Sequence, residues 1–243
     1  MCNTCSRRGL LLGAGLAVLG TTTTAGAAKA QTECGPSTSK LPSSCSWHGA
    51  GMEDFQVFST SGRKQIDKAM IAELRRILTI LPINPGFKYI NDQNPNAFAD
   101  AKDTVPNTTG TVYIGLNLIN GEFEQADGGV AVAGICAHEC GHIYQFYNGW
   151  MDKLASDTAR LVELHADFLA GYYFGRTGLH SANKVKVFGN SLFSKGDYNF
   201  NDKDHHGTPE ERLTAMQRGY ETGTQGVSIE AAAEVGADYV SNQ

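Results

Sequence analysis

The sequence predicts an α+β fold that is mostly helical and carries a small, mainly antiparallel sheet. Hydrophobic residues make up 41% of the 243 residues and charged residues 19%, a balance that excludes a largely disordered or fibrous chain. Several long segments place apolar residues at helical spacing, whereas only short segments are rich in β-branched and aromatic residues. We therefore expect a few helices packed against a small sheet.

The first thirty residues have the composition of an export signal. Arg7 and Arg8 precede an apolar run over 9–20, and small residues lead to an A-x-A pattern at 28–30. The run is shorter than the roughly 20 residues that cross a membrane. The adjacent arginines resemble a twin-arginine signal, with a generic export signal as the alternative. We expect residues 1–30 to be cleaved and the protein to be periplasmic or secreted.

The charge balance excludes two kinds of partner. The chain has 20 Lys and Arg residues against 25 Asp and Glu residues, and its first thirty residues contain basic but no acidic side chains. The remaining chain is therefore more acidic than the net charge of −5 suggests. Such a chain does not attract nucleic acid or anionic lipid, and after cleavage no apolar run is long enough for stable membrane insertion.

Short patterns define the elements of the first half. Residues 31–56 are rich in Ser, Gly and Pro and lack periodicity, so we expect an extended N-terminal segment. Apolar residues at helical spacing predict a helix over 61–81, which Pro82 ends. We then expect a short strand at 87–90, a polar loop over 91–109 and a strand over 111–118.

Helical patterns dominate the second half. We expect helices over about 130–147, 153–174 and 181–193, a polar loop over 194–207, and a weaker Ala-rich helix over 228–240. A further helix begins at Thr208, because an N-cap Thr, a Pro at the first helical position and two acidic residues follow one another there.

Four cysteines remain after cleavage of the signal. Cys34 and Cys45 flank the Ser-rich stretch and form the natural disulfide pair of an exported protein. Cys136 and Cys140 are four residues apart in a predicted helix, where Cβ atoms lie about 5–6 Å apart against roughly 3.8 Å in a disulfide. We expect these two to be small buried hydrophobic residues.

The segment His138-Glu139-Cys140-Gly141-His142 fits the H-E-x-x-H pattern inside a predicted helix. The two histidines lie about 40° apart around the helix and one turn along it, so both imidazoles can reach one metal ion. Glu139 faces the same space and can accept a proton from water on the metal. Cys136 and Cys140 lie on the back of the helix and are poor ligands for this ion. The alternative is a pair of surface or core histidines without a metal.

The next predicted helix supplies the third ligand that a catalytic zinc site needs. Gln145 and Asn148 stand where the extended H-E-x-x-H-x-x-G-x-x-H motif has Gly and His, which excludes that arrangement. Glu163 and Asp167 share one helix face, so Glu163 is the candidate ligand and Asp167 can accept the free N–H of a ligand histidine. His165 lies on the other side, and we interpret it as a packing or surface histidine.

Several motifs in order resemble one group of metallopeptidases. The Glu-x-x-Ala-Asp pattern at 163–167 is similar to the gluzincins of the HtpX and CAAX-protease type and to soluble bacterial neutral zinc metallopeptidases. Asn96-Ala97-Phe98-Ala99 ahead of a strand, and His206 followed by Arg212, also resemble segments of that family, although Gly207 stands where relatives have Pro. The resemblance covers roughly 85–220 and implies a zincin-like domain over 57–243.

The resemblance implies a zinc-dependent endopeptidase that acts on peptides or unfolded proteins. Zn²⁺ held by His138, His142 and Glu163 leaves one position for water. Glu139 is then the general base that takes the proton of this water.

The resemblance also implies how a substrate is held. His206 stabilises the oxyanion and Arg212 orients its loop, with His205 as the alternative donor. The strand ahead of the central helix, taken as an edge strand, would pair with an extended substrate through Val112, Tyr113, Ile114 and Gly115.

Two other functions stay open. The site also fits a zincin-like envelope binding or regulatory protein without turnover, in which Glu139 would have no purpose. It fits equally a zinc hydrolase that acts on a non-peptide amide bond, and divalent ions other than zinc can occupy such ligands. Residues 31–56 are a linker, an inhibitory strand or a source of a thiolate for zinc, with a disulfide-pinned arm as the preferred interpretation.

Overall fold

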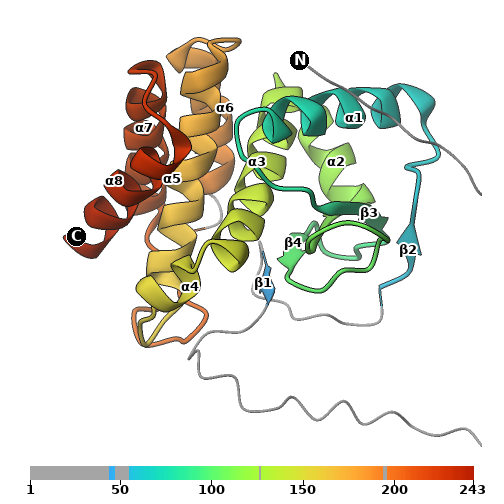
Figure 1. Ribbon diagram of the computed structural model, residues 1–243. Helices are drawn as coiled ribbons and strands as arrows, with labels where there is room; N and C mark the ends of the chain where they lie inside the picture. Colours follow the sequence, from blue (N-terminus) through green and yellow to red (C-terminus); the bar gives the residue numbers. More distant parts are fainter. Residues whose placement is uncertain (1–43, 47–54, 126, 194–195) are drawn as a thin grey trace, which may run out of the picture. The chain divides into compact units, whose positions relative to one another are not determined.

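A small sheet carries one part of the fold. Figure 1 shows the computed structural model, which describes residues 44–46, 55–125, 127–193 and 196–243. The strand order is β1-β4-β5-β3-β2, and the β3–β5 pairing is parallel while the others are antiparallel. The strands are β1 (Ser44–Ser46), β2 (Val57–Phe58), β3 (Gly86–Ile90), β4 (Ala97–Asp100) and β5 (Thr111–Gly115).

Helices dominate the described structure, which confirms the predicted fold class. They are α1 (Lys64–Leu78), α2 (Leu116–Phe123), α3 (Gly128–Tyr147), α4 (Trp150–Lys153), α5 (Arg160–Thr177), α6 (Ala182–Phe193), α7 (Pro209–Thr224) and α8 (Ile229–Ser241). The helices predicted at 61–81, 130–147, 181–193 and 228–240 are confirmed to within a few residues. Among the residues that the structure describes, no helix is both long enough and apolar enough to span a membrane.

The helix predicted over 153–174 is wrong at its start. Helix α4 ends at Lys153, and α5 begins only at Arg160. Between them the Ser156 hydroxyl donates a hydrogen bond of 2.6 Å to the carbonyl oxygen of Thr158. Such local side-chain bonds compete with helical hydrogen bonds, so the chain leaves the helix here.

The predictions around the central strand are partly wrong. Residues 97–100 form β4 inside the predicted loop over 91–109. The strand predicted over 111–118 stops at Gly115, because helix α2 begins at the next residue.

A distant carboxylate starts helix α2. Asp92 accepts hydrogen bonds from the backbone N–H groups of Asn117 (2.7 Å) and Leu118 (3.0 Å), which lack partners within the helix. A Cβ atom at Gly115 would lie only 1.9 Å from Oδ2 of Asp92, so glycine is required there. The two partners are 25 residues apart, which is why no local pattern reveals this helix.

Strand β5 is the central strand of the sheet and not an edge strand. It is hydrogen-bonded to β3 on one side and to β4 on the other, and β4 pairs with β1 beyond it. The expected edge addition of a substrate along this strand is therefore wrong, because both of its backbone edges are taken. The residues concerned, which are all buried, are Val112, Tyr113, Ile114 and Gly115.

Helix α3 lies between the sheet and helix α5 and contacts both (Figure 1). Cys136 and Cys140 are free, buried residues in the core around α3, as predicted. Cys34, and with it the predicted disulfide to Cys45, lies outside the described residues, as do the export signal and most of 31–56. The core around α3 also contains the strand residues Ala97, Ala99, Val112 and Ile114.

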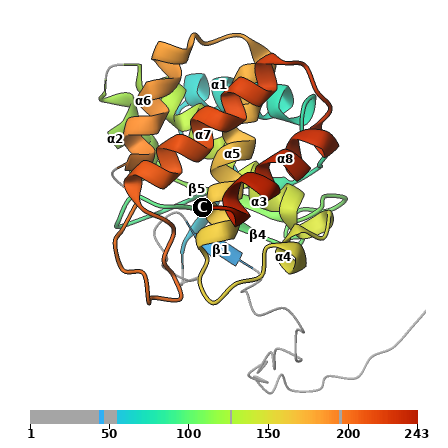
Figure 2. The same ribbon diagram turned by 90° about the vertical axis from the view of Figure 1, so that its left-hand side faces the viewer.

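Helices α5 and α7 pack closely through glycines. Figure 2 shows α7 crossing in front of α5, with α6 and α8 on the same side. A Cβ atom at Gly171 of α5 would lie 1.9 Å from the carbonyl oxygen of Met216. One at Gly219 of α7 would lie 1.8 Å from that of Phe168. Only residues without a Cβ atom permit this approach, which brings the start of α7 close to α5.

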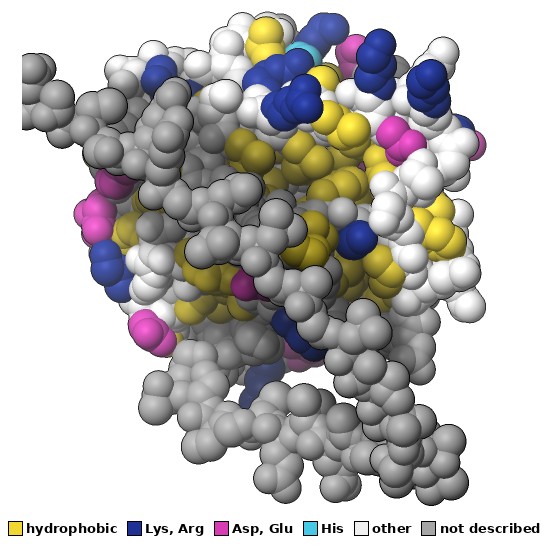
Figure 3. Space-filling model, turned by 45° about the vertical axis from the view of Figure 1, so that its right-hand side comes forward, with side chains coloured by type: hydrophobic (Ala, Val, Ile, Leu, Met, Phe, Trp, Pro, Cys, Tyr) yellow, Lys and Arg dark blue, Asp and Glu magenta, His cyan; other side chains and the backbone are white. Residues whose placement is uncertain are grey.

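The face that carries α1, α2 and the sheet exposes hydrophobic side chains, which gather near the centre of the view in Figure 3. Val57, Ile71 and Phe123 belong to β2, α1 and α2 and are 48%, 51% and 40% exposed. Exposed hydrophobic side chains are common on protein surfaces, and nothing in the described structure identifies a partner for this face.

Candidate metal centre

Two neighbouring helices bring the predicted metal ligands together. His138 and His142 lie one turn apart on α3 and face α5, which supplies Glu163. Nε2 of His138 lies 3.1 Å from Nε2 of His142 and 3.4 Å from Oε2 of Glu163. Nε2 of His142 lies 3.3 Å from Oε1 of Glu163, and all three side chains are at most 1% exposed. This buried group could hold a metal ion.

The partners of the two histidine rings fix where their protons lie. Nδ1 of His138 lies 2.8 Å from Oδ1 of Asp167, and Nδ1 of His142 lies 2.7 Å from Oε1 of Gln145. Both partner atoms are acceptors, so each Nδ1 carries the proton and each Nε2 carries a lone pair. Two lone pairs and the Glu163 carboxylate then face one another across little more than 3 Å. That arrangement is repulsive without a cation between them.

Asp167 connects this group to helix α7. Arg212 donates from Nε and Nη2 to the two oxygens of Asp167 at 2.7 and 2.9 Å, and its Nη2 lies 3.8 Å from Oε2 of Glu163. Thr208 caps α7 in a capping box with Glu211, which fixes the turn that presents Arg212. Arg212 is fully buried, so its charge offsets those of the two carboxylates where no water can.

Glu139 is the acidic side chain of the site whose carboxylate lacks a hydrogen-bond partner among the described residues. Its side chain is fully buried, and neither carboxylate oxygen has a hydrogen-bond partner among the described residues. Burial raises the pKa of Glu139 to about 7, although the neighbouring His138 and His142 oppose the shift. A buried acid without a partner is costly, so it marks a functional group more often than a packing residue.

Glu163 has the opposite acidity. Burial alone would raise its pKa, but the neighbouring imidazoles of His142, His206 and His138 hold the pKa well below its ordinary value. Glu163 therefore stays a carboxylate, the form that binds a metal ion.

The loop over 196–207 places its two histidines differently. Nδ1 of His205 lies 2.6 Å from Oδ1 of Asp197, and the backbone N–H of His206 donates to Oδ2 of the same carboxylate at 3.2 Å. His205 thus anchors the loop, whereas His206 helps to lower the pKa of the Glu163 carboxyl group. Sequence reasoning missed Asp197, because no spacing relates it to a motif.

Gln145 is a second residue that sequence reasoning missed. It is fully buried beside His142, three residues along the same helix face, and that spacing could have revealed it. His165 is also fully buried, and burial lowers its pKa to about 4. His165 is therefore not a surface histidine, and the surface alternative is wrong.

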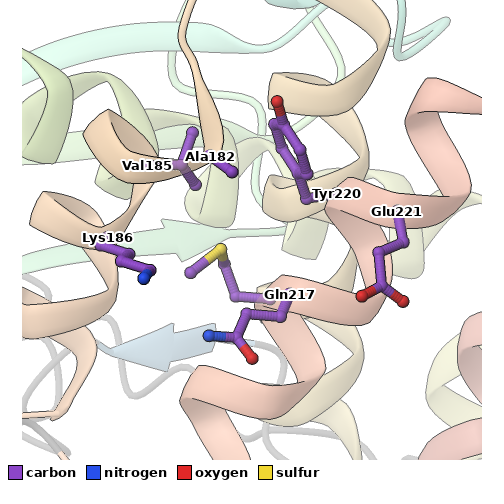
Figure 4. Close-up of a pocket in the computed structure, with 7 residues that line it drawn as sticks. Ala182, Val185, Lys186, Gln217, Tyr220 and Glu221 are labelled. Carbon is purple, nitrogen blue, oxygen red and sulfur yellow. The ribbon is translucent and has the colours of Figure 1, made fainter.

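A groove between α6 and α7 is separate from the metal-ligating group of His138, His142 and Glu163. It has a volume of about 230 Å³ and is mainly apolar, with one lysine and one glutamate at its margin (Figure 4). Its lining includes none of the residues of the metal centre, so it does not extend that site. Its lining consists of Ala182, Val185, Lys186, Met216, Gln217, Tyr220 and Glu221.

Comparison with known proteins leaves the geometry as the basis for assigning a function. No protein-family model, no curated protein and no solved structure matches this chain. What the chain does show is a buried His-His-Glu group, consistent with an H-E-x-x-H type metal site, in a mostly helical α+β fold.

Proposed function

We propose that this protein is an exported zinc endopeptidase with Glu139 as its general base. The observation that carries the proposal is the buried, unpartnered Glu139 carboxylate beside three convergent metal-ligating atoms. A protein that only bound a metal or a partner would have no use for such an acid. Export rests on the sequence pattern of residues 1–30.

The ligand spacing supports zinc as the metal. Zinc binds histidine nitrogen and carboxylate oxygen at about 2.0–2.2 Å, so the ligand atoms of a tetrahedral site lie roughly 3.3–3.5 Å apart. The three separations here are 3.1, 3.3 and 3.4 Å. Two histidines and one glutamate also form a ligand set that catalytic zinc sites use, with the fourth position left for water.

The residues around this position can carry out hydrolysis. When bound, zinc supplies a Lewis acid that lowers the pKa of water towards neutrality. Glu139 accepts the proton of that water at a carboxylate oxygen, and its pKa of about 7 suits both this step and return of the proton to the leaving amine. His206 donates to the carbonyl oxygen as negative charge develops there. Asp167 keeps the proton of His138 on Nδ1 throughout.

A peptide is the proposed substrate because the motifs resemble those of metallopeptidases. Recognition cannot use the backbone of β5, since both of its edges are paired. Among the described strands, β1 and β2 are the outermost and are the places where an extended chain could add. A non-peptide amide would need the same catalytic residues, so the experiment must distinguish the two substrates.

Cleavage of an unbiased peptide mixture, followed by mass spectrometry, tests the proposal. We expect the zinc-loaded protein to cut peptides and Glu139→Gln to keep zinc while losing about 10²- to 10⁴-fold in rate, the usual contribution of a general base. Glu221→Gln, which changes a glutamate that is 61% exposed, is the matched control and should cut normally.

Equal cleavage by Glu139→Gln would remove Glu139 from the mechanism. Absence of cuts by a wild-type protein with bound zinc would contradict the peptidase proposal. It would favour either a non-peptide amide substrate or a binding role.

A further inference from the structure

A series of buried hydrogen bonds runs from the metal centre to helix α8. Oε1 of Gln145 lies 2.7 Å from Nδ1 of His142, and Nε2 of Gln145 lies 3.0 Å from Nδ1 of His165. Nε2 of His165 lies 3.0 Å from the carbonyl oxygen of Ala233 in α8. The side chains of Gln145 and His165 are fully buried. We call this series, from His142 through Gln145 and His165 to Ala233, the relay.

The acceptor at the far end fixes the direction of every bond in the relay. The Ala233 carbonyl can only accept a hydrogen bond, so Nε2 of His165 carries the proton. Nδ1 of His165 is then a hydrogen-bond acceptor. The amide nitrogen of Gln145 donates to that Nδ1 and to the carbonyl oxygen of Val162 at 2.8 Å. The amide oxygen therefore faces His142, whose Nδ1 must donate. Turning the amide over would set its oxygen against two acceptors, which is costly in a buried site.

We propose that Gln145 and His165 are positioning residues that hold His142 as the Nδ1–H tautomer, with the lone pair of Nε2 turned towards the other metal ligands. The inference rests on the metal centre of the proposed function. It adds that zinc affinity depends on two residues that do not touch the metal.

The two ligand histidines are held by chemically different acceptors. His138 is held by the carboxylate of Asp167, whose charge is offset by Arg212. His142 is held by a neutral amide that adds no charge to the centre. The orientation of this amide is fixed at its nitrogen, which donates hydrogen bonds to Nδ1 of His165 and to the Val162 carbonyl oxygen.

Helices α4 and α8 hold His165 in one orientation. The ring of Trp150 in α4 lies 5.0 Å from the His165 ring, centre to centre. In α8, a Cβ atom at Gly236 would lie 3.0 Å from Cδ2 of His165, so glycine leaves the space that the ring occupies. The C-terminal helix therefore contributes to the orientation of a metal ligand on α3.

Nitrogen NMR of the histidine rings in the zinc-loaded wild-type protein tests the relay without any substitution. We expect His142 to carry its proton on Nδ1 and His165 to carry its proton on Nε2, so the two rings are opposite tautomers. A His165 ring protonated on Nδ1, alone or together with Nε2, would overturn the relay.

Zinc affinity, measured by competition with a chromophoric chelator, tests the consequence. Gln145→Met keeps the side-chain length but cannot accept from His142, so we expect about 10- to 100-fold weaker binding, the usual effect of losing such a partner. His165→Phe keeps the ring and leaves Gln145 its bond to Val162, so the weakening should be smaller. Cys140→Ala, a buried change on the back of α3, should lower the Tm without changing zinc affinity.

The visible spectrum of the cobalt-substituted protein separates positioning from loss of stability. It should change in Gln145→Met and stay unchanged in Cys140→Ala. Wild-type zinc affinity in Gln145→Met would overturn the relay and leave the proposed function intact. A wild-type protein that binds no zinc would instead overturn the proposed function and the relay together. If Gln145→Met does not fold, the tautomers of the wild-type protein decide.

Discussion

Glu139 and Glu163 are both buried in one site, yet their pKa values shift in opposite directions. Burial dominates at Glu139, where no hydrogen bond from the described residues stabilises the anion. At Glu163 the neighbouring histidines outweigh burial. One carboxyl group can therefore exchange a proton near neutral pH while the other stays anionic, which is the division that a base and a metal ligand require.

The buried charges of the site depend on one arginine. Arg212 is the cation that faces both Asp167 and Glu163, and its fork makes two bonds to Asp167. A lysine could not reproduce this planar, two-bond geometry. The position of His138 is therefore indirectly set by Arg212, through Asp167.

We predict that Arg212→Met lowers the free energy of unfolding by about 3–5 kcal/mol, because breaking a buried ion pair from one side leaves an uncompensated charge. Urea unfolding of the metal-free protein measures this loss. Arg218→Met is the control, since Arg218 forms an exposed pair with Glu221 and should cost less than about 1 kcal/mol. A cost of similar size in both variants would show that the buried pair has no special role.

At the scale of the helices, the approach of α7 to α5 decides where Arg212 lies. Gly219 and Gly171 let the two backbones come closer than any side chain would allow. Each of these glycines is followed four positions later by a second one, Gly223 in α7 and Gly175 in α5, whose Cβ atoms would also meet the partner backbone. The arginine can reach Asp167 because these glycines remove the bulk between the helices.

Gly219→Ala should therefore destabilise the protein by at least about 3 kcal/mol, at the upper end of the usual cost of overpacking, because its Cβ atom would meet a backbone carbonyl that cannot turn away. Thermal unfolding measures the effect. Gly121→Ala in α2 is the control: nothing lies within 4 Å of that Cβ atom, so the change should be neutral or stabilising by up to about 1 kcal/mol. Equal stability of the two variants would contradict the packing argument.

Elements encoded by local patterns were predictable, and elements set by distant contacts were not. The helical spacing of apolar residues in α1 lies within that helix, and the capping residue Thr208 directly precedes α7. Helix α2 instead depends on Asp92, 25 residues before its first turn, and β4 depends on pairing with strands on both sides. The pairing of β4 also explains why the predicted substrate edge at β5 does not exist.

The site likewise divides into residues that local spacing predicts and residues that distant contacts place. Spacing within one helix singled out His138 and His142, and spacing within the next singled out Glu163 and Asp167. In the sequence, Gln145 is notable only because it departs from the extended H-E-x-x-H-x-x-G-x-x-H motif. In the structure it lies beside His142. The anchoring of His205 by Asp197 depends on how the loop folds back, which the sequence does not express.

On the scale of the whole described structure, the candidate metal centre joins two groups of elements. Helix α3 contacts the sheet, and α5 contacts α7 and α8. A metal ion bound by His138, His142 and Glu163 would cross-link the two groups, so metal binding should also stabilise the fold. The hydrogen bond from His165 to Ala233 extends this connection to the C-terminal helix.

The zinc content of the purified protein after dialysis against a weak chelator, compared between wild type and Glu163→Ala, tests the metal centre most directly. We predict one zinc ion per chain in the wild type and little or none in Glu163→Ala, because the variant keeps only the two histidines of a three-ligand group. Full zinc occupancy in Glu163→Ala would remove Glu163 from the ligand set. A wild-type protein without zinc would contradict the metal centre itself.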